Sequence, residues 1–126
     1  MFTRAHRFHL IVDLSAVVAA LLLLAVTGSP WGGSAGFALL ALHAVAAIRD
    51  PRGPAQDERD VAHQLAASRA GFIATWIAFV LVSTVLLVAR AEDSVPTWVL
   101  AWMVYGGWAI QSAVTSSVAL ALDRSA

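Results

Sequence analysis

Residues 70–89 read AGFIATWIAFVLVSTVLLVA, an apolar run without a single charged side chain. A helix needs roughly 20 mostly apolar residues to cross the hydrocarbon core of a bilayer, because unpaired backbone groups cannot face lipid. No wide polar face would have to be hidden, because apolar residues lie around much of the helix, namely Phe72, Ile73, Trp76, Ile77, Phe79 and Val80. This stretch therefore predicts a membrane-spanning helix.

Three further stretches approach the length of a span: residues 10–27, 31–48 and 95–122. The first ends at Gly28, a residue suited to a helix C-terminus. Ser29 can cap the next helix and Pro30 fits its first position, so a tight turn should join the first two spans. Ser94 is the expected cap of the last span, with Pro96 in its first turn. The sequence predicts an all-α fold, a polytopic membrane protein built as a four-transmembrane-helix bundle.

The composition agrees with a membrane protein and excludes other classes. Of the 126 residues, 60% are hydrophobic and 13% are charged, which is far from the balance of a soluble domain. The formal net charge is zero and the sequence has neither a basic groove nor an aromatic RNA-binding pattern, so nucleic acid is not an expected partner. The chain has no cysteines, which excludes disulfides, thiolate metal sites and cysteine nucleophiles.

The arginines set the expected orientation, because cytoplasmic loops carry an excess of Arg and Lys. Arg90 alone falls on one side of the predicted spans. The arginines on the other side are Arg4, Arg7, Arg49, Arg52, Arg59, Arg69 and Arg124. We therefore expect one membrane domain over residues 1–126, multi-pass in the cytoplasmic (inner) membrane, with the N-terminus, the C-terminus and the 49–69 segment in the cytoplasm.

A secretory signal peptide is the alternative for the first span, since Arg4 and Arg7 precede an apolar run and small residues follow at 33–36. Cleavage would leave three spans and move the new N-terminus outside. Asp13 interrupts the apolar run, which favours a helix that is retained.

Residues 49–69 hold a dense group of charges. Pro51 and Pro54 should end the second span. From about Ala55 onward no residue stops a helix, so one long helix is expected to run from the cytoplasm into the third span. The stripe of this helix that should pack on the other helices is Val61, Leu65, Ser68 and Phe72.

The charged start of this helix is Asp57, Glu58, Arg59 and Asp60. With small residues and an apolar span after it, it resembles an uncharacterised family of small prokaryotic four-span membrane proteins, whose members carry an Asp-Glu-Arg motif just ahead of their third span. The resemblance implies the topology and no activity, substrate or cofactor. By their own chemistry, these side chains are either a solvated helix start near the positive end of the helix dipole or a docking surface for a cytoplasmic partner.

All four histidines and one aspartate should project to the cytoplasmic side: His6, His9, Asp13, His43 and His63. His6, His9 and Asp13 share one face of the first helix, and His43 lies at a depth similar to that of Asp13. Because an ionisable group avoids lipid, we expect Asp13 and His43 to face the interior and interact directly or through one water. Such a cluster could bind a divalent metal, ligate haem, relay protons or serve as a structural hydrogen bond.

The last span carries weaker signals. Its cytoplasmic half holds polar residues that should bond to neighbouring helices or to their own backbone, namely Gln111, Ser112, Thr115 and Ser116. Gly106 and Gly107 would let helices approach closely, or else would mark a kink along a substrate path. The aromatic stripe of this span, suited to packing or to stacking a quinone or pigment, is Trp98, Trp102 and Tyr105.

No catalytic motif is present: the sequence has no phosphate-binding glycine loop, no HExxH zinc motif and no G-x-S-x-G nucleophile elbow. The leading expectation is a non-enzymatic membrane protein that acts as a regulator, immunity factor or accessory subunit, through contacts with another protein or as a homo-oligomer. The alternatives are a small transporter or proton-coupled channel, and a redox protein that binds a metal or haem through the histidines. Apart from that last reading, no cofactor is expected.

Overall fold

The computed structural model describes residues 2–49, 57–89 and 94–125, and every regular element in them is a helix. In chain order the elements are α1 (Phe2–Thr27), α2 (Pro30–Ser34), the 3-10 helix η1 (Ala35–Ala41), α3 (Leu42–Arg49), α4 (Glu58–Ala89) and α5 (Thr97–Arg124). The predicted all-α class is confirmed.

Three of these stretches are long and apolar enough to cross a membrane. They are Thr3–Thr27, Pro30–Arg49, in which α2, η1 and α3 run on from one another, and Glu58–Ala89. Within the described residues α5 is not one of the three, although it has 28 residues. Its second half carries polar side chains, which include Gln111, Ser112 and Thr115.

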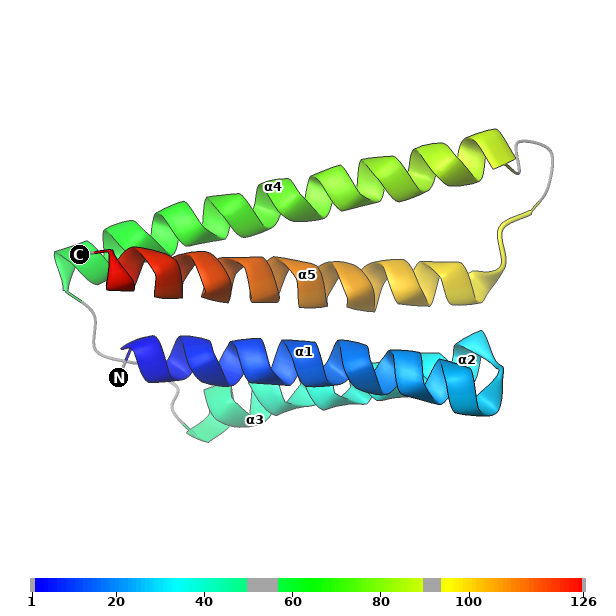
Figure 1. Ribbon diagram of the computed structural model, residues 1–126, viewed down its shortest axis with the longest axis horizontal. Coiled ribbons are helices and arrows are strands. Elements are labelled where there is room, and N and C mark those ends of the chain that lie inside the picture. The colour runs from blue at the N-terminus through cyan, green and yellow to red at the C-terminus, as the bar shows by residue number, and fades with distance from the viewer. Residues whose placement is uncertain (1, 50–56, 90–93, 126) are drawn as a thin grey trace.

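The helices α1, α5 and the α2–η1–α3 stretch pack around one core, and α4 lies against α5 at the edge (Figure 1). The buried apolar side chains of that core are Ala16, Ala20, Phe37, Leu40 and Ala109. A smaller cluster between α4 and α5 contains Ala67 and Ala119. Figure 1 also shows α4 diverging from α5 toward Ala89.

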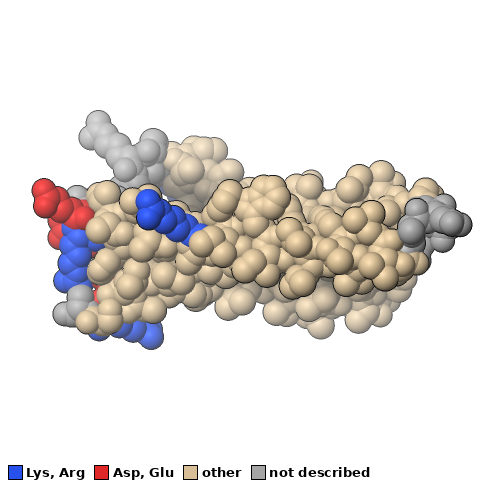
Figure 2. Space-filling model, turned by 90° about the horizontal axis from the view of Figure 1, so that it is seen from above, with Lys and Arg blue, Asp and Glu red and all other residues tan. Residues whose placement is uncertain are grey.

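One end of the molecule, called the charged end below, collects most of the charge. There α1 and α4 begin and α3 and α5 end (Figure 1). In a view from above, the charged side chains of the described residues on the visible face lie toward this end (Figure 2). The α1–α2 turn lies at the opposite end, called the far end.

The tight turn predicted between the first two spans is confirmed. Gly28 has a φ of 64°, which glycine adopts without strain, and its N–H donates to the carbonyl of Leu24 at 2.9 Å. Ser29 is the N-cap of α2 and accepts from the N–H of Gly32 at 3.4 Å, and Pro30 stands at the first helical position. These residues end α1 and start α2 with almost no loop.

The predicted start of the last span was wrong in detail. Ser94 does not cap α5, because the N-cap is Pro96, whose ψ of 143° is extended. The first helical residue is therefore Thr97, and no cap side chain bonds to the first turn of α5.

The long helix predicted ahead of the third span is confirmed as a continuous α4. Its first helical residue is Glu58, and the predicted start at Ala55 lies outside the described residues. The packing stripe was predicted wrongly, since Val61, Leu65 and Phe72 are all more than half exposed. Small residues let helices pack more closely than large apolar side chains do.

Small residues make the helix contacts instead. Gly71 and Ala67 are the buried residues of α4, and a Cβ atom at position 71 would meet the backbone carbonyl of Gln111 on α5. A Cβ atom at Gly107 would meet the ring of Phe79 on α4, whereas one at Gly106 would meet nothing within 4 Å. Of the two candidate glycines in α5, only Gly107 is therefore used for close packing.

Candidate functional site

The predicted contact between Asp13 and His43 is confirmed. Asp13 on α1 is completely buried, and the His43 side chain on α3 is 10% exposed. The Nε2 atom of His43 donates to Oδ1 of Asp13 at 2.7 Å. The second carboxylate oxygen of Asp13, Oδ2, is buried and has no hydrogen-bond partner among the described residues. Burying a carboxyl group is costly unless it is hydrogen-bonded, and the His43 imidazole supplies that bond.

A second histidine extends this contact into a chain. The Nδ1 atoms of His9 and His43 lie 2.6 Å apart, so one of them donates to the other. If His43 is neutral, its Nδ1 accepts from His9; if His43 carries a second proton, its Nδ1 donates to His9. The direction of this bond therefore depends on where the proton lies. Asp13, His43 and His9 form what is called the proton chain below.

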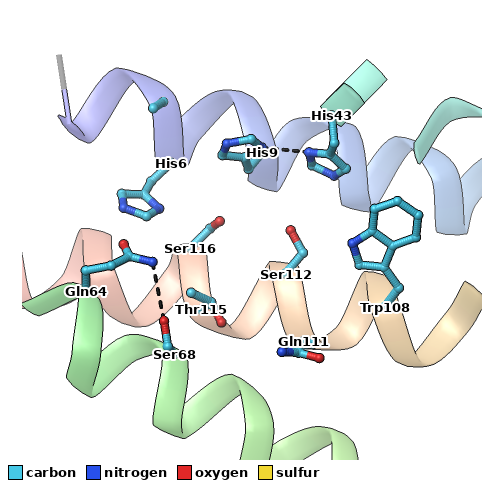
Figure 3. A pocket seen from close by; sticks show the side chains of 11 residues that line it. His6, His9, His43, Gln64, Ser68, Trp108, Gln111, Ser112, Thr115 and Ser116 are labelled. Atoms are coloured by element: carbon cyan, nitrogen blue, oxygen red, sulfur yellow. Dashed lines mark hydrogen bonds between the residues drawn. The ribbon is translucent and has the colours of Figure 1, made fainter. Parts of the chain in front are cut away.

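The proton chain borders a polar pocket of about 620 Å³ near the charged end (Figure 3). The pocket takes its walls from α1, α3, α4 and α5. Its polar and aromatic lining residues are His6, His9, His43, Gln64, Ser68, Trp108, Gln111, Ser112, Thr115 and Ser116. Figure 3 shows Ser112 and Ser116 of α5 on the side of the histidines, whereas the exposed Gln111 lies on the side of α5 that faces α4.

The pocket brings together several groups that were predicted separately. The polar residues in the second half of α5 all line it, namely Gln111, Ser112, Thr115 and Ser116. Ser116 is only 2% exposed. Gln64 and Ser68 on α4 were not predicted as site residues, although their i, i+4 spacing puts them on one helix face; their side chains bond to each other at 3.4 Å. Trp108 was also missed, and its ring centroid lies 6.0 Å from that of His43.

The five residues predicted as metal ligands are only partly brought together. His6, His9 and His43 line the pocket and Asp13 bonds to His43, whereas His63 on α4 does not line it. Over residues 2–49, 57–89 and 94–125, no three His, Asp or Glu side chains are grouped so that they could hold one metal ion. A metal or haem at these residues stays a prediction, and His9, His43 and Asp13 make hydrogen bonds to one another.

The charged motif at the start of α4 caps the N-terminus of that helix. The N–H of Asp60 donates to Oδ1 of Asp57 at 2.8 Å, and the N–H of Asp57 donates to Oδ2 of Asp60 at 3.3 Å. This reciprocal pair is a capping box, in which each side chain satisfies a backbone N–H of the first turn. Two of the four residues predicted as a partner surface are thus engaged, and Glu58 and Arg59 remain exposed beside them.

We expect Asp57→Ala to loosen the start of α4. An N-cap side chain is worth about 1 kcal/mol, which corresponds to roughly fivefold faster amide exchange in the first turn. Hydrogen exchange measured by mass spectrometry over the start of α4 would show it. Arg59→Ala, an exposed neighbour outside the capping box, is the matched control and should leave exchange unchanged. Equal exchange in both variants would contradict the capping role.

A second pocket lies toward the far end. It has a volume of about 570 Å³, lies between the Pro30–Arg49 stretch and α5, and is lined by residues that include Ser34, Phe37 and Tyr105. Trp108 belongs to the lining of both pockets. The indole ring therefore stands where the pocket near the charged end and the pocket toward the far end meet.

Comparison of the chain with protein-family models, with curated proteins and with solved structures finds no match. The family resemblance at Asp57 to Asp60 therefore stays an expectation. What the protein does has to be argued from the geometry of the site.

Proposed function

We propose that the chain is a four-span protein of the cytoplasmic membrane with its charged end in the cytoplasm. Three stretches have the length and composition to span, and α5 lies among them as a helix of 28 residues. The described arginines support the orientation, since Arg4, Arg7, Arg49, Arg59, Arg69 and Arg124 all lie toward the end where α1 begins and α5 ends. Large apolar side chains on the outside of α4, such as Ile73, Trp76 and Ile77, suit contact with lipid.

This topology can be tested with reporter fusions. Fusions after Gly33 and after Glu92 should give the signal of an exported reporter, and fusions after Pro54 and Ala126 should give that of a cytoplasmic one, because the arginine-rich side is retained inside. An alkaline phosphatase and a fluorescent protein make a complementary reporter pair. A cytoplasmic signal after Gly33 would contradict the four-span arrangement.

Within this frame, we propose that the protein is a small proton-coupled carrier without catalytic chemistry of its own. The observation that carries the proposal is the proton chain of Asp13, His43 and His9 at the edge of an open polar pocket. Ionisable residues inside a membrane are costly and mark ion or proton pathways far more often than they serve packing. Imidazoles are suited to the task because their charge changes near neutral pH.

The surroundings of the proton chain favour a carrier over a channel. From Asp13 toward the far end, α1 continues with Ala16 and Ala20, which pack with Phe37 and Leu40 in the apolar core. Within the described residues the proton chain thus has no polar continuation past Asp13. A channel would need a continuous path, whereas a carrier needs a site that is open to one side at a time.

The two pockets that share Trp108 in their linings also support a carrier. A solute in the pocket near the charged end would have to pass the indole ring to reach the pocket toward the far end. The ring also lies beside His43, so a charge on that imidazole would act on the indole face. The accessory-protein reading has less support, because the capping box uses the carboxylates of Asp57 and Asp60.

The test uses the full chain in liposomes that contain a pH-sensitive dye. Organic acids, amines, amino acids and sugars are added outside, one class at a time. At least one class should change the internal pH, because the solute crosses together with or against a proton. Without a solute the liposomes should hold an imposed pH difference, since the apolar core closes the path beyond Asp13.

The control for this test is Asp13→Asn, which keeps the shape of the side chain and removes its charge. It should bring the solute-driven pH change down to that of empty liposomes. A proton leak in the absence of any solute would replace the carrier with a channel, and no response to any class would contradict proton coupling.

A further inference from the structure

The lining of the pocket near the charged end carries no carboxylate, lysine or arginine among the described residues. It offers imidazoles, hydroxyls, amides and the Trp108 indole, and Asp13 is fully buried against His43 without lining the pocket. A cation would find no anionic side chain there. An anion would find several hydrogen-bond donors and histidines that can become cationic.

Two polar side chains of the lining are themselves more than nine-tenths buried. His6 is 7% exposed and Ser116 is 2% exposed, and both line the pocket. Polar groups buried to this degree normally serve a hydrogen-bonding purpose, because their burial costs free energy. The pocket is therefore built into the packing of α1 and α5 and is not a chance hollow between exposed side chains.

The proton chain limits how a further proton can enter. When His43 carries hydrogen on both ring nitrogens, its Nε2–H donates to Asp13 and its Nδ1–H donates to Nδ1 of His9, 2.6 Å away. If His9 takes up another proton on Nδ1, both facing nitrogens carry hydrogen. That bond must then break, and the His9 ring becomes a cation released from His43.

A carboxylate ligand in the pocket would stabilise His9 in its protonated form, released from His43. The new positive charge on His9 has no counter-charge in the lining, and a carboxylate supplies one while accepting the Nδ1–H in a charge-assisted hydrogen bond. The indole of Trp108 can cover an apolar part of the ligand. A pocket of about 620 Å³ is of the size that small organic molecules occupy.

We propose that this pocket binds a small organic carboxylate together with one proton, and that the proton settles on His9 as its bond to His43 breaks. The proposal rests on the carrier function proposed above and names the class of its solute. Uptake is electrically balanced, since one proton enters with one anion. Because the two binding events are linked, each strengthens the other.

The titratable groups around His9 act on it in opposite directions. Burial and the imidazoles of His43 and His6 disfavour a positive charge on its ring, and the carboxylate of Asp13 favours one. In the described residues, α4 and α5 set no titratable group against His9. Asp123 on α5 acts on His6 and accepts a hydrogen bond from Thr3 at 2.6 Å. The proton that accompanies the ligand is assigned to His9 on its geometry, since its Nδ1 lies 2.6 Å from that of His43 and its ring lines the pocket.

The experiment compares three probes of nearly the same shape: benzoate, neutral benzamide and the benzamidinium cation. Each is titrated calorimetrically into the full-length protein in lipid nanodiscs, with protein-free nanodiscs subtracted, in buffers of different ionisation enthalpy. Above about pH 7, where a free carboxylic acid is ionised and an ordinary histidine is mostly neutral, the Kd of benzoate should rise about tenfold for each pH unit. The buffer series should show one proton taken up for each benzoate bound.

Variants locate the proton. His9→Gln keeps a hydrogen-bonding side chain and should abolish proton uptake, whereas His63→Gln changes a histidine outside the pocket and should leave it unchanged. The ¹⁵N signal of His9 Nδ1 in the unaltered chain provides a measurement that does not depend on whether a variant folds. It should change from a strongly hydrogen-bonded to an imidazolium value when benzoate is added.

The other outcomes overturn the inference. Benzoate binding without proton uptake, or no benzoate binding, would remove the carboxylate and proton as joint ligands. Benzamidinium binding with proton release would make the pocket a cation site and would leave the carrier function intact. The liposome measurement decides separately whether that function holds, because it tests all solute classes.

Discussion

Replacing Gly36 with alanine is expected to destabilise the protein by about 2 kcal/mol or more. A Cβ atom at position 36 would collide with the backbone of Ala19 and Ala20 in α1. Backbone cannot rotate away as a side chain can, so η1 and α1 must separate, and overpacking of this kind costs typically 1–3 kcal/mol. Unfolding in mixed micelles with rising SDS, followed by tryptophan fluorescence, would measure the loss.

Gly106→Ala is the matched control, because a Cβ atom there meets nothing within 4 Å. Alanine is a better helix former than glycine by roughly 0.5–1 kcal/mol, so this variant should be as stable as the parent or slightly more stable. The two substitutions thus have opposite expected signs. Equal effects would contradict the close contact of Gly36 with the backbone of α1.

The second large effect is expected at Asp13. Asp13→Leu removes the acceptor of the His43 Nε2–H at 2.7 Å and leaves a buried imidazole without its partner. Removing one member of a buried charged pair costs about 3–5 kcal/mol. The same SDS titration should show an early transition, and the expression level in the membrane should fall.

Asp13→Asn separates folding from function at the same position. The amide oxygen of asparagine still accepts from His43, so its stability should stay within about 1.5 kcal/mol of the parent, the net worth of one hydrogen bond. Ser15→Leu, at an exposed site on α1, controls for the added apolar bulk and should change stability by no more than about 0.5 kcal/mol. If Asp13→Leu were as stable as Asp13→Asn, the bond to His43 would not hold the helices.

Several parts of the site could be predicted from the sequence, because each of them depends on a single local rule. Depth along the helices and the cost of exposing an ionisable group to lipid were enough to pair Asp13 with His43. Gly28 and Pro30 fix the turn that makes α1 and the next stretch antiparallel, which brings that pair together. The polar residues of α5 lie together in its second half, where they line the pocket.

Other parts depend on distances between helices, which periodicity does not contain. Val61 and Leu65 have the right spacing for a buried stripe, yet α4 turns Ala67 and Gly71 toward α5, because close backbone approach favours small residues. The bond between His9 and His43 needs two rings on different helices within 2.6 Å, which no spacing rule foresees. Trp108 was missed for the same reason, since it matters only where two pockets meet.

The helix type of the seven η1 residues sets both the length of the stretch between the far end and His43 and its rotation about the helix axis. A 3-10 helix advances about 2.0 Å and turns about 120° per residue, whereas an α-helix advances 1.5 Å and turns about 100°. If Ala35–Ala41 rewound to α geometry, the stretch would shorten by about 3.5 Å and turn α3 by roughly 140°. His43 would be carried out of reach of both Asp13 and His9. A change of helix type in this one short segment would thereby break the bonds of His43 to Asp13 and His9. No hinge in a loop would be needed.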